Sequence, residues 1–167
     1  MDIREVTKFL VGTKIAVMAT VNSDGSPHLS PNWYYYDGER LYFVTTKERR
    51  KFFNLKRDRR ISVCVYEPPL ASDYVVLQGP AIIENLIPTS ELWRIARLVV
   101  ERYVDVNEVD NYIERWKTEP RILVTLTPDD IYTRSRHSKT MGPNFSDSPE
   151  CLRVQEIRGR SRHSRNF

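Results

Sequence analysis

Short runs of β-favouring residues, separated by turn signals, occupy most of the first half of the chain and constrain its fold more than any other feature. The run at residues 15–21 ends at Asn22-Ser23-Asp24-Gly25-Ser26, and the aromatic-rich run at residues 27–36 ends at Asp37-Gly38. An Asp-Gly pair between apolar runs favours a tight hairpin, because glycine adopts a positive φ at little cost. Strands joined by hairpins pair antiparallel, so the pattern argues against βαβ repeats.

Further strand and helix patterns complete the predicted order of elements. Strand-like composition is found at residues 41–46, 60–66, 73–84 and 121–127. Apolar side chains recur at helical intervals in residues 2–11, 48–58, 89–104 and 109–116. A proline cannot donate to a strand ladder, so Pro31 predicts an incomplete ladder in its strand, and the Gly79-Pro80 pair predicts a bulge or an edge strand. We expect an α+β fold that is mainly β, an antiparallel barrel or sheet with a few helices.

The composition narrows the class of protein. The 167 residues suit one domain, or one domain and a tail, and 40 % hydrophobic residues exclude a wholly disordered chain. No apolar run approaches the ~18 residues that cross a bilayer, and the first residues lack an apolar signal core, so we expect no membrane partner. The two cysteines, Cys64 and Cys151, form neither a CxxC pair nor a disulfide framework. We therefore expect a cytoplasmic protein without a metal centre.

Positive charge is concentrated in two segments. Residues 47–60 contain eight basic and two acidic side chains, and residues 133–167 contain eight basic and three acidic ones, although the formal charge of the whole chain is only +4. Beyond Tyr132 the apolar periodicity ends. We therefore predict one domain over residues 1–132 and a basic, flexible tail over residues 133–167. Nucleic-acid binding through this tail is a less favoured hypothesis.

The segment Thr45-Thr46-Lys47-Glu48-Arg49-Arg50-Lys51 is the one that suggests chemistry. A strand ends there, and a helix then begins with several cations. Free N–H groups at a helix start attract phosphate, hydroxyl groups donate hydrogen bonds to it, and arginine and lysine neutralise its charge. The same spacing is typical of a basic helix face in water. An anion site and a solvated face therefore both stay open on these residues alone.

Two other features have both a functional and a structural interpretation. His28 precedes the aromatic run and could donate a proton near a ligand, but a histidine in a surface turn is the simpler hypothesis. In the aromatic run at residues 33–36, alternate side chains share a face if the run is a strand. One face could stack on an aromatic ligand, and either could pack in the core.

The order of several motifs resembles a known superfamily. The motifs are Ile15-Ala16-Val17-Met18-Ala19-Thr20, Asp24-Gly25-Ser26-Pro27-His28, Trp33-Tyr34-Tyr35-Tyr36-Asp37-Gly38, Arg49-Arg50-Lys51 with Asn54-Leu55, and Leu77-Gln78-Gly79-Pro80-Ala81. Over about residues 3–132 the chain looks like the split β-barrel flavin and deazaflavin oxidoreductases related to pyridoxamine 5′-phosphate oxidase. Within them it is most similar to the single-domain, coenzyme F420-dependent subgroup.

This resemblance implies a six-stranded antiparallel split β-barrel with flanking helices, assembled as a homodimer with two cofactor sites at the interface. The cofactor phosphate would be held by Arg49, Arg50 and Lys51. The ring would lie along Ser30, Pro31, Asn32 and Trp33, and Val44, Thr45 and Thr46 would cover another edge. The partner subunit would contribute Tyr74 and Gln78.

The resemblance also implies an oxidoreductase that passes hydride from a reduced cofactor to a small conjugated substrate. F420 is favoured and FMN comes next, because the acidic tail of F420 would suit the extra charge of Arg57 and Arg59. Solvent or a hydroxyl such as Thr45 or Ser30 would supply the proton, and no dedicated catalytic residue is identified. The alternative is a non-catalytic module that stores or senses a flavin or a tetrapyrrole. The basic C-terminal pattern by which the oxidase itself holds its pyridoxal phosphate has no match here, which argues against vitamin B6 oxidation.

Overall fold

The strands curl into a split barrel of antiparallel strands in a computed structural model that describes residues 1–87, 90–135 and 151–153. The strands are β1 (Ala16–Val21), β2 (Pro27–Asn32), β3 (Tyr35–Tyr36), β4 (Leu41–Thr46), β5 (Arg60–Tyr66), β6 (Tyr74–Asn85), β7 (Arg121–Leu126), β8 (Asp130–Arg134) and β9 (Cys151–Arg153). The helices are α1 (Ile3–Val11), α2 (Arg50–Arg57), α3 (Trp93–Glu101), the 3-10 turn η1 (Val106–Glu108) and α4 (Val109–Lys117). The main strand order is β2-β1-β5-β6-β7-β4-β3, with β8 and β9 branching from β6. The predicted mainly β, α+β split barrel is confirmed.

The long strand β6 joins the two halves of the barrel. Its first part pairs with β5 and β8, and its last part, from Ala81, pairs with β7. The change of partner occurs at Gly79-Pro80, where a Cβ on Gly79 would lie 2.8 Å from the carbonyl oxygen of Thr127. The predicted irregularity at this pair is thus a crossover between sheets. The edge-strand alternative is wrong, because β6 has partners on both sides.

The predicted strand over residues 27–36 is divided in the structure. The run at residues 27–36 forms β2 and β3, which pair with β1 and β4 respectively. The division arises because Tyr34 is fully buried and its hydroxyl donates to the carbonyl oxygen of Leu10 at 2.8 Å, so the chain turns inward between the two strands. Residues 130–134 do not extend β7 but form β8 against β6.

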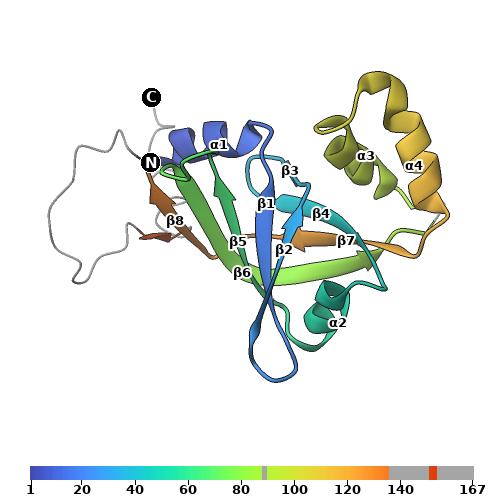
Figure 1. The fold of residues 1–167 in the computed structure, drawn as a ribbon, viewed down its shortest axis with the longest axis horizontal. Coiled ribbons are helices and arrows are strands. Elements are labelled where there is room, and N and C mark those ends of the chain that lie inside the picture. The colour runs from blue at the N-terminus through green and yellow to red at the C-terminus, as the bar shows by residue number, and fades with distance from the viewer. Residues whose placement is uncertain (88–89, 136–150, 154–167) are drawn as a thin grey trace, which may run out of the picture.

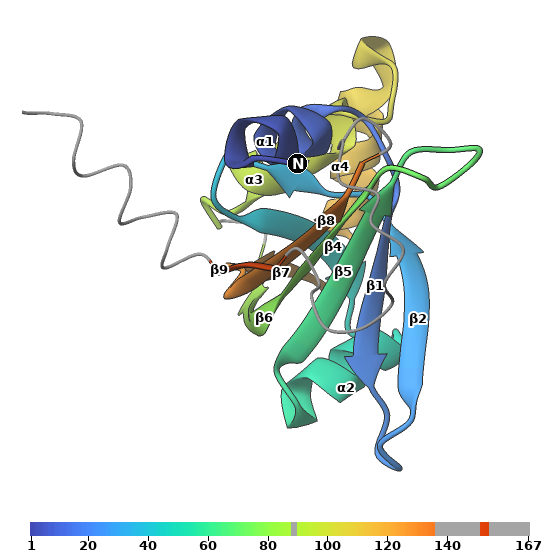
Figure 2. The same ribbon diagram turned by 90° about the vertical axis from the view of Figure 1, so that its left-hand side faces the viewer.

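The core consists of two apolar clusters. One fills the barrel beneath α1, whose N-terminus is closed by a capping box between Asp2 and Glu5. The other lies between the α3–α4 pair and the outer side of β4. Helices α1 and α2 lie toward opposite ends of β1 and β5, and α3 with α4 stands to one side (Figures 1 and 2). The helices therefore surround the strands but do not cover the region near β2 and the end of β4, where a site can form.

The predicted tail contributes the end of β8, at residues 133–134, and the strand β9. Strand β9 pairs with β8, so part of the segment beyond residue 132 joins the sheet. Residues 136–150 and 154–167 of the tail lie outside the described residues. Among the helices of the described ranges, none is both long and apolar enough to span a membrane.

Candidate functional site

A cavity of about 770 Å³ lies where β2, the end of β4, the start of α2 and the junction between α4 and β7 meet. Ten of the twelve residues proposed from the sequence line it, namely Ser30, Pro31, Asn32, Trp33, Val44, Thr45, Thr46, Arg49, Arg50 and Lys51. The other lining residues are Ile15, His28, Trp116, Glu119 and Arg121. We call this space the basic cavity, because four cations line it against one carboxylate.

The start of α2 explains how these cations are positioned. Strand β4 ends at Thr46, and the helix begins at Arg50 with Arg49 as an N-cap that makes no side-chain capping hydrogen bond. The buried face of α2 carries Lys51, Asn54 and Leu55, which have helical i, i+3, i+4 spacing. Lys51 is therefore directed inward, whereas its neighbour Arg50 is exposed.

Lys51 is the most unusual charge in the site. Its side chain is buried, and its ammonium donates a hydrogen bond to Oδ1 of Asn32 on β2. Across the described part of the chain, no carboxylate lies within salt-bridge distance of it. Burial, and then the nearby charge of Arg49, lower the pKa of Lys51 to about 8. A buried cation paired only with an amide is stabilised by an anionic ligand.

A buried polar network supports α2 from below. Asn54 donates to Oγ1 of Thr20 at 3.0 Å and to Oδ1 of Asn22 at 3.1 Å. Thr20 also lies 3.5 Å from Nδ1 of His28, which is half-buried on β2 and faces the basic cavity. The simpler hypothesis of a surface turn for His28 is therefore wrong. The network ties the helix that carries the cations to the strand that forms one wall of the cavity.

Arg57 and Arg59 do not belong to the basic cavity. Arg57 donates to the carbonyl oxygen of Val21 and to Oδ1 of Asn54, so it is held against the end of β1. Neither arginine lines the cavity. The sequence-based expectation that these two residues add charge for an acidic tail is not supported by their positions.

An aromatic cluster forms the wall beside α3 and α4. The Trp33 ring stacks on Tyr103, with ring centres 5.1 Å apart and planes 4° apart, and it also contacts Tyr112 and Trp116. Trp33 and Tyr35 pack with the helix pair, whereas Tyr34 and Tyr36 are in the barrel core. The predicted alternation of faces is confirmed, even though the strand is interrupted.

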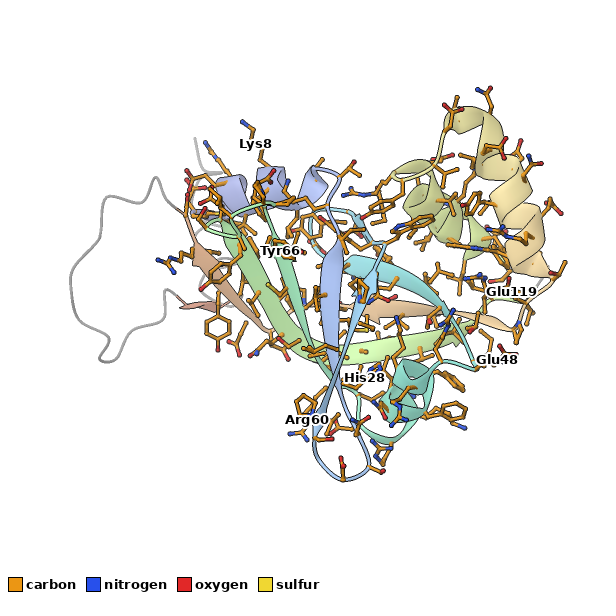
Figure 3. The ribbon with its side chains drawn as sticks, viewed as in Figure 1. Lys8, His28, Glu48, Arg60, Tyr66 and Glu119 are labelled. Carbon is orange, nitrogen blue, oxygen red and sulfur yellow. The ribbon has the colours of Figure 1, made fainter. Side chains whose placement is uncertain are left out.

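Sequence reasoning missed the part of the cavity wall that lies between α4 and β7. Figure 3 labels Glu119 at this junction and His28 on β2. Arg121 pairs in register with Thr46 of β4, and its guanidinium donates to Oε2 of Glu119 at 2.6 Å. Only the β4–β7 pairing brings these residues to the cavity, and no local motif marks that pairing in the sequence.

The two residues expected to act from a partner subunit lie elsewhere. Gln78 lines a second cavity of about 670 Å³ between β1, β5 and β6, and its Nε2 lies 3.3 Å from Oγ of Ser62. Tyr74 lies at the start of β6, opposite Tyr66 of β5. Within one chain, neither residue lines the basic cavity.

Comparisons with known proteins agree with this architecture. A conserved hypothetical protein of Mycobacterium tuberculosis is 26 % identical, with a TM-score of 0.70 over 90 % of this chain and 94 % of that one. An F420 reductase is 21 % identical, with a TM-score of 0.55 over 74 % and 93 %. The heme storage protein HutZ of Vibrio cholerae is 19 % identical, with a TM-score of 0.61 over 78 % and 93 %. At these last two identities the likeness shows the fold alone.

The match to a sequence family is broader than any single motif. It extends over residues 3–135, from the first helix through β8, and so includes both walls of the basic cavity and the cations of α2. Together with the antiparallel split barrel, this match establishes that the chain belongs to the pyridoxamine 5′-phosphate oxidase family.

Proposed function

We propose that this protein is an oxidoreductase that binds a flavin-type cofactor, F420 in preference to FMN, and passes hydride to a small conjugated substrate. The observation that carries the proposal is Lys51, a buried ammonium without a carboxylate partner among the described residues. Together with Arg49 and Arg50, it lines a cavity that lies between two strands. The volume of the basic cavity lies in the range of sites for small molecules and cofactors.

The residues present fit a planar group with an anionic arm. Arg49, Arg50 and Lys51 would hold the arm through charge-assisted hydrogen bonds. The rings would lie between residues 30–32 of β2 and residues 44–46 of β4, which line the cavity. When bound, such a cofactor supplies the hydride chemistry, and the protein binds it, orients it and excludes water. The Thr45 hydroxyl is buried in this wall and is a candidate to hold a proton near the rings.

We propose that the site is completed in a homodimer. The basic cavity is partly open, and Tyr74 and Gln78 lie outside it within one chain. A partner subunit that presents its β6 to this opening would add these two side chains. The proposal predicts that cofactor affinity depends on residues from both chains.

A non-catalytic tetrapyrrole-binding module is the second candidate. The observation in its favour is His28, whose imidazole reaches the cavity wall and could ligate iron. A heme storage protein shares this fold. Under this alternative the protein would bind hemin tightly through His28, and it would show no turnover with a reduced flavin-type cofactor.

Direct titration separates these functions. Purified protein is mixed with F420, FMN or hemin, and binding is followed by fluorescence or by the Soret band, with equilibrium dialysis as a second method. We expect F420 to bind best, with a dissociation constant below ~100 μM, roughly −5.5 kcal/mol. If neither F420 nor FMN binds below this limit, the oxidoreductase proposal is wrong. Tight binding of hemin that is lost in His28→Ala supports the second candidate.

A further inference from the structure

Arg121 is a fourth cation of the basic cavity that the proposed phosphate contacts do not use. Its side chain is 12 % exposed, its guanidinium carbon lies 4.0 Å from the centre of the Trp116 ring, and it forms an ion pair with Glu119. Its Nε is buried and has no hydrogen-bond partner within the described ranges. An unpaired buried N–H group is costly, so Glu119 alone leaves the guanidinium incompletely satisfied.

The backbone places Arg121 close to the start of α2 but on a different wall. Arg121 is the register partner of Thr46, and the amide of Lys47 donates to the carbonyl oxygen of Pro120 at 2.9 Å. Burial is the main cause that lowers the pKa of Arg121, the ion pair with Glu119 opposes it, and the charges of Arg115 and Arg49 act in the same direction as burial. The two groups of cations therefore share one electrostatic environment.

The balance of charges indicates what this environment would bind. Arg49, Arg50, Lys51 and Arg121 face the cavity with only Glu119 as a counter-charge. A phosphate monoester carries at most about two negative charges, which leaves positive charge uncompensated. A guanidinium fork matches the two oxygens of a carboxylate, and here the fork is already oriented by Trp116 and Glu119.

We propose that Arg121 binds a carboxylate on the arm of the cofactor, and that Glu119 occupies the guanidinium until this carboxylate replaces it. This inference rests on the proposed function and deepens it. The ligand class becomes a deazaflavin whose arm carries both a phosphate ester and carboxylates, as in F420, rather than a flavin with a phosphate alone. Arg121 is then the residue that distinguishes the two cofactors.

The test compares three probes that differ in their anionic groups. They are F420, F420 whose carboxylates have been converted to methyl esters, and FMN. In Arg121→Gln we expect the dissociation constant of F420 to rise about tenfold or more, since charged hydrogen bonds are worth roughly this factor, whereas those of the ester and of FMN change little. Arg49→Gln should weaken all three probes alike. Lys56→Gln is the matched control, because Lys56 is an exposed cation of α2 that lies outside the cavity.

Glu119→Gln provides an independent measurement. Removing the internal carboxylate should free Arg121 and lower the dissociation constant of F420 several-fold, with no change for the ester, which a merely structural ion pair would not produce. Equal effects of Arg121→Gln on all probes, or no effect on any, would overturn the proposal. If Arg121→Gln does not fold by circular dichroism, the absence of any gain for F420 in Glu119→Gln overturns it. Wild-type protein that binds F420 and its ester equally refutes this inference alone, whereas wild-type protein that binds no probe refutes the proposed function as well.

Discussion

Lys51 shows how one buried side chain can connect the stability of the fold to ligand binding. Its ammonium is removed from water, yet among the described residues its one hydrogen bond is to the neutral amide of Asn32. Most buried charges in proteins are paired with an opposite charge. In the free protein the charge of Lys51 is therefore not compensated by a carboxylate. The same burial makes the site favour an anionic ligand.

The cations at the start of α2 can be tested directly by substitution. Arg49→Ala and Lys51→Ala should each raise the dissociation constant of F420 by about ten- to a hundredfold, because hydrogen bonds to charged groups are worth about 1.5–3 kcal/mol. Lys56→Ala, an exposed cation on the same helix that lies outside the cavity, is the control and should leave the affinity within about twofold. Fluorescence titration measures all three variants. An unchanged affinity in Arg49→Ala and Lys51→Ala would place the cofactor elsewhere.

The lowered pKa of Lys51 makes binding depend on pH. With a pKa of about 8, only about a tenth of the free protein is protonated at Lys51 at pH 9, so the F420 affinity should fall about tenfold between pH 7 and pH 9. Phosphate monoesters titrate near pH 6, below this window. The Lys51→Met variant should bind more weakly and show no such slope. A pH slope that persists in Lys51→Met would assign the titration to another group.

The same group has the opposite effect on folding. Because the folded-state pKa of Lys51 lies below that of an unfolded lysine, the unfolded chain binds more protons between about pH 8 and pH 10. Its contribution to the free energy of unfolding therefore rises with pH across that window. Binding and stability should thus change in opposite directions over the same pH range.

At the scale of elements, the crossover strand β6 depends on Gly79. A side chain there would meet the Thr127 carbonyl oxygen at 2.8 Å and the Asp129 amide nitrogen at 3.2 Å, and both are backbone atoms that cannot move alone. We expect Gly79→Ala to lower the free energy of unfolding by about 1–3 kcal/mol, the usual cost of overpacking. Urea denaturation followed by circular dichroism measures this loss.

Gly12→Ala is the matched control for that prediction. The atom nearest to a Cβ at Gly12 is the Lys14 ammonium at 2.6 Å, which is the end of a flexible side chain and can move away. Neither glycine has a positive φ, so the comparison isolates close packing from backbone conformation. Equal losses in the two variants would mean that the close approach at Gly79 does not limit stability.

The elements that could be predicted are those bounded by turn residues. Strands β4 and β5 match the predicted residues 41–46 and 60–66, because Asp37-Gly38, the α2 cations and Pro68 mark their limits. The break between β2 and β3 could not be predicted. An aromatic run has the same alternation whether or not one member, here Tyr34, turns into the core.

The candidate site shows the same division. Arg49, Arg50 and Lys51 are adjacent in the sequence, so a helix start alone places them together. Glu119 and Arg121 reach the cavity only through the register of β7 against β4, strands that are separated by about half of the chain. Register depends on long-range packing, and single-sequence patterns do not encode it locally.

At the scale of the whole molecule, the proposed homodimer predicts complementation between two defective chains. Arg49→Ala and Gln78→Ala should each lack tight F420 sites, because each damages one half of every site. When the two variants are unfolded together and refolded, about half of the dimers should be mixed and carry one intact site each, or about a quarter of a site per chain. Titration of the mixture measures this stoichiometry. No recovery of tight sites would mean that Gln78 does not act across the interface.

The edge strand β2 has a consequence for how this protein behaves when concentrated. Pro27 and Pro31 lie four residues apart and both pair in register with β1, so the amide hydrogens they lack are missing from the outer edge of the sheet. Leu29 alone keeps a donor between them on that edge. A strand from another molecule therefore finds few backbone donors at the free edge of β2, which disfavours edge-to-edge association into fibres. The basic cavity beside β2 stays accessible to small molecules.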